Sequence, residues 1–365
     1  MAYRSRRPPM PQLLRLLVLA AMVATTATAC TGDDSGTGAR SPAVPQERAA
    51  GHEPADTLTV YSRDRFIAEP LFKLFEQQTG IKVKARWGDP IKLADQIIED
   101  GGDSTADVFY GPLSDALGSL SAAGRLAPLS AGQLQRVPQA YRSPDGTWVG
   151  TAGRAHVVFY NTDRLSEDDL PDSILGFTDP AWRGRIGWDP TSRSLQDVIT
   201  ELRQLKGEDE TRGWLQGIQA NAPAAVPGAV PIVKAVAAGK IIQVGFGSHS
   251  YLYYLQDDGE ANNVAAKFYP GGEPGGLLNV AGVGIIKGTS HQAAANAFVD
   301  FMLSPAAQRY FAEEAFEIPV VGGAEPPSGS GIPTAAKLTV PGLNVRAFEK
   351  LQDARRLLTE VGVIM

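Results

Sequence analysis

The chain has 365 residues, of which 43% are hydrophobic, so it can bury a core large enough for two ordinary domains. Its 34 Lys and Arg residues are outnumbered by 40 Asp and Glu residues, and the sequence contains no long basic run. This balance argues against nucleic acid as a partner. Four histidines in the whole chain also make a histidine-rich metal cluster improbable.

The N-terminus has the organisation of an export signal. Four arginines precede the apolar run 16–24, and small residues then lead into Cys30. The apolar run is too short for a transmembrane helix, so residues 1–29 are predicted to be a signal peptide. Cys30 is the only cysteine, and its position at the cleavage point resembles a bacterial lipobox, which predicts acylation of this residue.

The stretch 30–56 follows the predicted cleavage point and is rich in Gly, Ser, Asp, Pro and Ala. Such a composition cannot bury enough apolar surface to fold, which predicts a disordered tether. We therefore expect an extracytoplasmic protein that is anchored to the cell membrane by acylated Cys30. The lipid anchor would be its only contact with the membrane.

From residue 57 onward, short apolar strands alternate with segments of helical periodicity. Strands are predicted at 57–62, 81–85, 106–110, 186–188 and 241–246. Helices are predicted at 67–79, 91–99, 113–123, 195–205, 214–220, 232–238 and 293–303. The alternation predicts an α/β protein with a mostly parallel sheet covered on both faces.

Two extended crossings interrupt this alternation. The first, 148–160, consists of two extended runs separated by Gly153 and Arg154, and the second is 276–286. Extended crossings between α/β blocks are typical of a two-lobed, hinged protein. The predicted division is a first lobe of 57–152 plus 277–320, a second lobe of 157–275, and a C-terminal extension, 321–365, that packs on the lobes.

A cluster of polar and aromatic side chains, 248–254, follows the strand predicted at 241–246. Turning of the backbone at Gly245 and Gly247 would place it at the end of a strand, where α/β proteins usually bind ligands. The alternative is an aromatic core in which the hydroxyls are satisfied locally. We expect His249 to be a hydrogen-bonded packing residue.

Motifs in order along 57–365 resemble the ferric-ion-binding solute receptors of bacterial ABC importers. They are Leu58–Ser62, Thr79–Val83, Ala106–Tyr110, Ala152–Arg154 before Val157–Thr162, Trp182–Gly187 before Pro190–Ser192, Pro274–Gly275 with Val280–Gly282, Leu303–Pro305 and Ala307–Phe311. The resemblance implies a type II periplasmic-binding-protein fold with two hinge crossings. It also implies that the protein closes on a small ligand and delivers it to a permease with its ATPase, and we expect a monomer.

The iron ligands that the resemblance implies match this sequence only in part. Arg65 stands where the family has a histidine, Pro112 where it has a glutamate, and Ser250 and Tyr251 where it has two tyrosines. Tyr251 is therefore the predicted metal ligand. Substitutes for the missing tyrosine stand close by at Tyr253 and Tyr254. Because Fe(III) prefers anionic oxygen ligands, we expect it to arrive with a synergistic anion or a chelator.

Arginines are expected to give the cleft positive charge, since guanidinium does not bind metal but suits carboxylate or phosphate. The turn 191–194 also opens a helix, whose free N–H groups favour an anion. The predicted ligand-binding residues are Arg63, Arg65, Arg154, Ser192, Arg193, Ser194, Ser248 and Ser250. Alternatively, some of these arginines are surface charges or a hinge ion pair, and one of the serines only caps the helix.

The leading hypothesis is a substrate-binding lipoprotein of an ABC importer that carries iron. The alternatives are a receptor for a metal-free organic anion, such as a phosphonate, a phosphate ester or a carboxylate, and a surface sensor with the same two-lobed fold. An enzyme is not expected, because the sequence contains neither a G-x-S-x-G nor an H-E-x-x-H motif.

Overall fold

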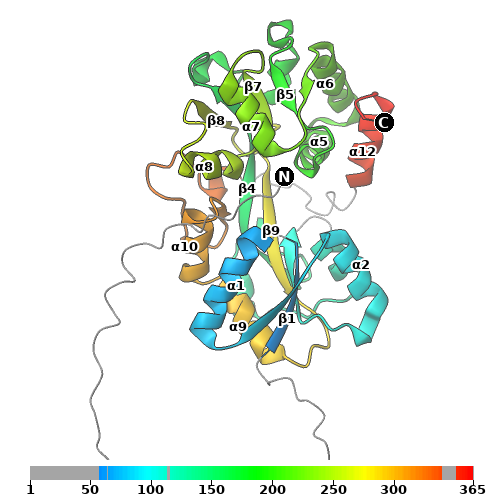
Figure 1. Cartoon of the computed structure of the whole chain (residues 1–365). Helices are drawn as coiled ribbons and strands as arrows, with labels where there is room; N and C mark the ends of the chain where they lie inside the picture. Colours follow the sequence, from blue (N-terminus) through cyan, green and yellow to red (C-terminus); the bar gives the residue numbers. More distant parts are fainter. Residues whose placement is uncertain (1–56, 64, 113–115, 339–350, 365) are drawn as a thin grey trace, which may run out of the picture. The chain divides into compact units, whose positions relative to one another are not determined.

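The computed structural model describes residues 57–63, 65–112, 116–338 and 351–364, which all belong to one compact unit (Figure 1). The predicted signal peptide, Cys30 and the predicted tether lie outside the described residues. No helix in the described part of the chain is long and apolar enough to cross a membrane.

The first lobe is built on one half of a long sheet, with strand order β2-β1-β3-β9-β4. The strands are β1 (Thr57–Ser62), β2 (Lys82–Trp87), β3 (Val108–Pro112), β4 (Trp148–Asn161) and β9 (Leu278–Ile285). β1 runs parallel to β2 and β3, whereas β9 runs antiparallel to β3 and to β4.

Helices cover this half of the sheet on both sides. They are α1 (Arg65–Thr79), α2 (Pro90–Asp100), α3 (Gly118–Ala122), α4 (Ala131–Gln135), α9 (Gln292–Met302) and α10 (Pro305–Glu313). Phe72 and Phe75 of α1 pack edge-on against Phe298 of α9, with ring centroids 5.4 and 5.1 Å apart. On the other side of β1 lies α2 (Figure 1). The side chain of Asp89 caps the N-terminus of this helix.

The second lobe continues the same sheet. The far half of β4 pairs with β7 (Val244–Ser248) and β8 (Val264–Phe268), and β7 pairs in turn with β5 (Ile186–Trp188), next to β6 (Ala224–Ala225). The expectation of a mostly parallel sheet is wrong, because four strand pairs are parallel and five are antiparallel. The two strands that cross between the lobes account for this, since they run against their neighbours.

Four helices cover the second half of the sheet. They are α5 (Arg193–Lys206), α6 (Glu208–Ala220), α7 (Ala229–Ala238) and α8 (Ser250–Asp257). Buried side chains of α7 and α8 belong to the apolar core that continues from the first lobe, whereas those of α5 and α6 form a second core on the other face. Short 3₁₀ turns complete the connections at Gly101–Asp103, Gln139–Tyr141, Glu167–Asp169, Ile174–Thr178 and Pro180–Trp182.

The first crossing between the lobes differs from its prediction. It is one continuous strand, β4, and Gly153 and Arg154 lie inside it rather than between two runs. A bulge between Gly150 and Ala152 takes up the extra residue, and β10 (Ile318–Pro319) pairs with the strand at Gly153.

Gly245 and Gly247 also have a role other than the predicted one. Both lie within β7 and do not turn the chain. A Cβ at Gly245 would stand 2.4 Å from Cγ2 of Ile232, and one at Gly247 would stand 2.6 Å from Cε2 of Phe159. These glycines therefore allow side chains from neighbouring elements to approach the strand closely.

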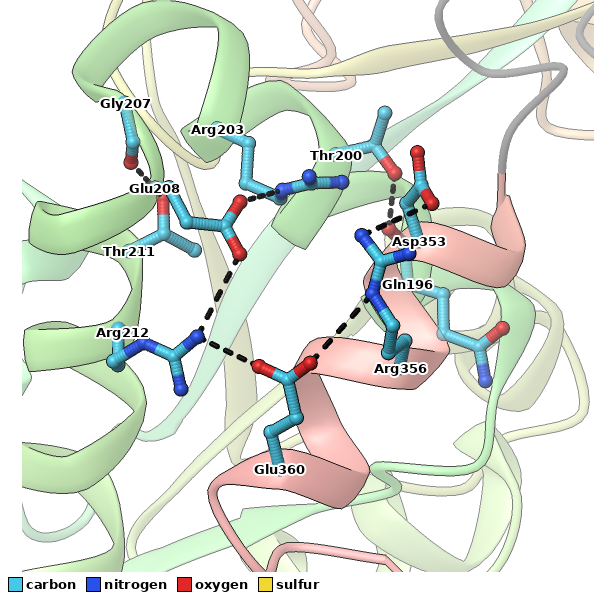
Figure 2. A network of polar contacts seen from close by, with 10 residues as sticks. All are labelled: Gln196, Thr200, Arg203, Gly207, Glu208, Thr211, Arg212, Asp353, Arg356 and Glu360. Atoms are coloured by element: carbon cyan, nitrogen blue, oxygen red, sulfur yellow. Dashed lines mark hydrogen bonds and ion pairs between the residues drawn. The ribbon is translucent and has the colours of Figure 1, made fainter.

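After α11 (Ala335–Leu338), the last described element is α12 (Leu351–Glu360), which packs on α5 of the second lobe. Ala354, Leu357 and Leu358 are buried in that contact. Figure 2 shows the polar network around it, in which Glu360 pairs with both Arg212 of α6 and Arg356 of α12.

Candidate functional site

A pocket of about 490 Å³ lies where several strands of both lobes end. Ser62 closes β1, Tyr110 stands near the end of β3, and Ser248 closes β7. Residues of the hinge strands β4 and β9 also line it, at Arg154 and Asn279. Because the carboxyl ends of strands in α/β sheets are the usual places for ligands, this pocket is the candidate site.

The second-lobe wall of the pocket consists of residues at the beginnings of three helices. They are Asp189, Ser192, Arg193, Ser194, Asp197, Gly228, Ala229, Ser248 and Tyr251. The N-cap residues of α5, α7 and α8 are Ser192, Gly228 and His249. The N-terminus of a helix carries partial positive charge and free N–H groups, so this wall favours an anion.

The predicted serines have separate positions on this wall. Ser192 caps α5, since its Oγ accepts a hydrogen bond of 3.3 Å from the amide of Leu195. The hydroxyls of Ser194 and Ser248 lie 3.3 Å apart and both line the pocket. Ser250 is 1% exposed and does not line it. The structure thus brings three of the four predicted serines to the pocket.

Of the three candidate tyrosines, only Tyr251 lines the pocket. Within the described part of the chain its hydroxyl makes no hydrogen bond. Tyr253 donates to the carbonyl oxygen of Ser330 at 3.1 Å, and Tyr254 donates to that of Ala315 at 2.7 Å. Burial raises the pKa of Tyr253 to about 12, which disfavours its phenolate. The structure therefore places the two substitute tyrosines in a packed aromatic contact outside the pocket.

His249 is a hydrogen-bonded packing residue, as predicted. Its Nδ1 accepts a hydrogen bond of 3.0 Å from the amide of Ala155 on the hinge strand. Burial lowers the pKa of His249 to about 4, so the ring stays neutral at physiological pH. It anchors α8, and hence Tyr251, to β4.

Three of the four predicted arginines line the pocket, namely Arg63, Arg154 and Arg193. Arg65 does not. It lies on the exposed first turn of α1, where its Nε pairs with Glu69 at 2.9 Å. Arg154 stands at the hinge and pairs with Glu317 at 2.8 Å, so the predicted alternative of a hinge ion pair holds for a residue that also faces the pocket.

Three carboxylates that line the pocket were not predicted. Asp189 accepts hydrogen bonds from the amides of Thr191 (3.0 Å) and Gly228 (2.9 Å), and thereby joins the first turns of α5 and α7. Asp197 of α5 accepts from the side-chain amide of Asn279 on β9. The third is Glu317, the partner of Arg154. The expectation of a positive cleft is therefore wrong for the described lining residues, whose three arginines are balanced by three acids.

A metal in this pocket would depend on oxygen donors that arrive with it. In the described ranges, no group of three or more His, Cys, Asp and Glu residues is arranged to hold a metal ion. The phenol of Tyr251 is a hard oxygen donor on the second-lobe wall, where Asp189 and Asp197 accept hydrogen bonds from protein groups. Tyr110 presents a second phenol from β3. The helix N-termini beside Tyr251 could hold an anion that supplies the remaining ligands.

Several known proteins with similar sequences are described as iron-binding or iron-uptake proteins. An Fe(3+)-binding periplasmic protein of Serratia marcescens is 35% identical over 260 residues, which cover 69% of this chain and 75% of that protein. The crystal structure of iron-bound HitA from Pseudomonas aeruginosa shares 32% identity with a TM-score of 0.75, over 84% of this chain and 99% of the other. A Trichodesmium protein in complex with iron and citrate shares 29% identity with a TM-score of 0.72, over 84% and 99%.

These similarities confirm the predicted two-lobed periplasmic-binding fold. They also agree with the resemblance to ferric-ion receptors that the sequence motifs carry. The profile of a family described as bacterial extracellular solute-binding protein matches residues 103–345. The chain therefore belongs to the bacterial extracellular solute-binding protein family.

Proposed function

We propose that this protein is the ferric-iron receptor of an ABC importer, and that it binds Fe(III) together with an anion in the pocket between its lobes. The observation that carries the proposal is the position of Tyr251. Its phenol faces the pocket without a hydrogen-bond partner in the described residues, beside three helix N-termini. The iron-binding relatives support the same conclusion.

The chemistry of the second-lobe wall suits this role. A phenolate is a hard anionic donor that Fe(III) prefers, and metal binding would deprotonate the Tyr251 hydroxyl. A small anion at the first turns of α5 and α7 would complete the coordination of the metal. Arg193 lies at the first position of α5, where it can add charge-assisted hydrogen bonds to that anion.

The direct test is a titration of the purified protein with ferric citrate, followed by visible absorption and thermal unfolding. We expect a phenolate-to-iron charge-transfer band and a higher melting temperature, because a ligand that binds only the folded state stabilises it. Citrate without iron is the control for a metal-free receptor, and it should give a much smaller shift. A colourless protein whose melting temperature rises equally with both would contradict the proposal.

The partners and the location follow from the same proposal. We propose that residues 1–29 direct export, that acylated Cys30 and the tether 30–56 hold the protein at the cell membrane, and that a permease and its ATPase receive the iron. Membership of an extracellular solute-binding family supports this placement. Replacement of Cys30 by Ser should release the protein from membranes, and retention would contradict the anchor.

We further propose that the protein acts as a monomer and closes by rotation of 57–152 plus 277–320 against 157–275 about the two crossings, with 321–365 as the packed extension. The continuous strands β4 and β9 support a hinge at this place. Closure should appear as a fall in the radius of gyration on addition of ferric citrate, and an unchanged radius would contradict it.

A further inference from the structure

The first-lobe wall of the pocket, formed by Ser62, Arg63, Tyr110 and Gly111, differs in charge from the wall opposite. Arg63 is the only charged residue among these four. Among the described residues of this wall there is no carboxylate or imidazole, and the carboxylate of Glu317, which lines the pocket at the hinge, is paired with Arg154. A guanidinium cannot bind a metal ion, so this wall is suited to contact an anion.

Ser62 provides an independent indication that a ligand belongs here. Its side chain is 1% exposed, and its Oγ has no hydrogen-bond partner in the described ranges. Buried polar atoms in native proteins are nearly always hydrogen-bonded, so an unsatisfied hydroxyl in the lining of a pocket points to a ligand atom that completes it. The neighbouring residue in the chain is Arg63.

Arg63 is an exposed cation that no carboxylate in the described part of the chain compensates. Arg65, two residues further on, has Glu69 as its partner on α1. At the hinge, Arg154 has Glu317. The side chain of Arg63 is thus available to a ligand at the mouth of the pocket.

We propose that Ser62 and Arg63 form an anion subsite on the first-lobe wall, so that the cargo is an intact ferric chelate of a polycarboxylate. The proposal rests on the proposed function. The metal would face Tyr251 on the second-lobe wall, and a carboxylate of the chelator that points away from that wall would accept hydrogen bonds from Ser62 and Arg63. Closure of the lobes would then be driven by this carboxylate rather than by a metal ligand on the first lobe.

The volume and the charge of the pocket agree with such a cargo. A volume of about 490 Å³ is far larger than the roughly 10–15 Å³ that one water needs, and lies within the range of small-molecule sites. The three arginines and three acids of the lining balance. With the Tyr251 hydroxyl deprotonated, Fe(III) in a one-to-one complex with a trianion changes the net charge of the pocket by about minus one, whereas Fe(III) alone would add about two uncompensated positive charges.

The test is retention of the chelator. The purified protein is mixed with ferric citrate carrying ¹⁴C-labelled citrate, freed of excess ligand by gel filtration, and analysed for iron and label. We expect about one citrate for each iron. Replacement of Arg63 by Ala should weaken binding of ferric citrate by roughly ten- to a hundredfold, the effect of losing one charge-assisted pair. Ser62→Ala should weaken it less, and Arg63→Lys should lie between Arg63→Ala and the wild type.

Arg65→Ala is the matched control, because it removes the same charge two residues away at a side chain that does not line the pocket. It should bind ferric citrate as the wild type does. Iron retained without citrate, or equal affinities for Arg63→Ala and Arg65→Ala, would overturn the subsite and leave the iron receptor intact. Citrate retained equally well with and without iron would instead overturn the proposed function. A charge-transfer band that falls in Tyr110→Phe would show that the first-lobe wall binds the metal, which also overturns the subsite.

Discussion

The two walls of the pocket are supported in different ways. Behind the first-lobe wall, the interior is largely aromatic, with Phe72 and Phe75 of α1 packed against Phe298 of α9. Behind the second-lobe wall, titratable groups are buried in the fold, namely His156, His249 and Glu201. The wall that presents Tyr251 and the helix N-termini is therefore supported by several buried titratable groups, whereas the wall that presents Arg63 is supported by apolar packing together with the carboxylate of Asp107, which accepts a hydrogen bond from the amide of Thr59 on β1.

The two lobes therefore offer different groups to a ligand. The second lobe has the phenol of Tyr251, the helix N-termini and the polar network that can hold a ligand. The first lobe adds the buried hydroxyl of Ser62, the phenol of Tyr110 and the uncompensated cation of Arg63. A receptor of this kind would bind its cargo first on the second lobe. The first lobe would then contact the same cargo when the two lobes close. Three substitutions test the contacts that stabilise the two lobes. The first is at Arg154, which lies at the hinge between them.

The largest effect is expected at the hinge. Arg154→Ala removes the 2.8 Å ion pair with Glu317, whose side chain is only 3% exposed. Loss of one partner of a buried pair is strongly destabilising, and we expect a fall of about 3 kcal/mol in the free energy of unfolding, measured by urea titration. The double variant Arg154→Ala with Glu317→Gln should recover part of this loss. A single variant as stable as the wild type would show that the pair does not hold the walls together.

An effect of comparable size, but one that depends on pH, is expected in the second lobe. Burial raises the pKa of Glu201 to about 8 from an unfolded value near 4.5, so the unfolded state binds fewer protons between these values and stability falls as pH rises. Glu201→Gln should abolish that decline, making the variant more stable than the wild type by roughly a few kcal/mol at pH 8. The advantage should disappear near pH 4.5, where the carboxyl is protonated in both states.

The buried histidines act in the opposite direction. Burial lowers the pKa of His156 and of His249 to about 4, below their unfolded value of 6.5, so stability rises between pH 4 and 6.5. Together with Glu201 this predicts greatest stability of the wild type near pH 6.5. In Glu201→Gln the loss of stability below pH 6.5 should remain, whereas the loss of stability above pH 6.5 should disappear. If the stability of the wild type and that of Glu201→Gln depended on pH in the same way, the raised pKa of Glu201 would be contradicted.

The smallest effect is expected in the polar network of α12 (Figure 2). Arg212 pairs there with Glu360 at 2.7 Å and with Glu208 at 3.8 Å, but all three side chains are solvent-accessible. Exposed ion pairs contribute little, and salt screens them. Arg212→Ala should lower the melting temperature slightly at low salt and not at 1 M NaCl. Arg355→Ala on α12 is the control. A large fall in the melting temperature of Arg212→Ala that does not depend on salt would contradict this expectation and show that the network contributes strongly to stability.

Local sequence patterns predict most of the helices and strands. The features that they do not predict depend on contacts between residues far apart in the chain. The helix predicted at 195–205 is α5, and the strand at 186–188 is β5, because hydrophobic periodicity is a local property. The continuity of β4 depends on pairing with β9, more than a hundred residues away, so the sequence suggested a break at Gly153 instead.

The site shows the same limit. Tyr251 could be predicted because the family resemblance and the local chemistry coincide at this residue, whereas Glu317 lies 163 residues from Arg154 and no local signal joins them. Asp197 carried one signal that was missed, since a carboxylate stands among the apolar residues of the helix predicted at 195–205. Tyr253 and Tyr254 could not be separated from Tyr251 by sequence, because only the direction of α8 decides which phenol faces the pocket.

The most direct test of the account is the visible spectrum of the Tyr251→Phe variant in ferric citrate, measured beside Tyr253→Phe. The two variants each remove a phenol hydroxyl from the first turn of one helix, but of the two residues only Tyr251 lines the pocket. The account predicts that the phenolate-to-iron band is lost in Tyr251→Phe and kept in Tyr253→Phe. A band that survives in Tyr251→Phe, or disappears in Tyr253→Phe, would contradict it.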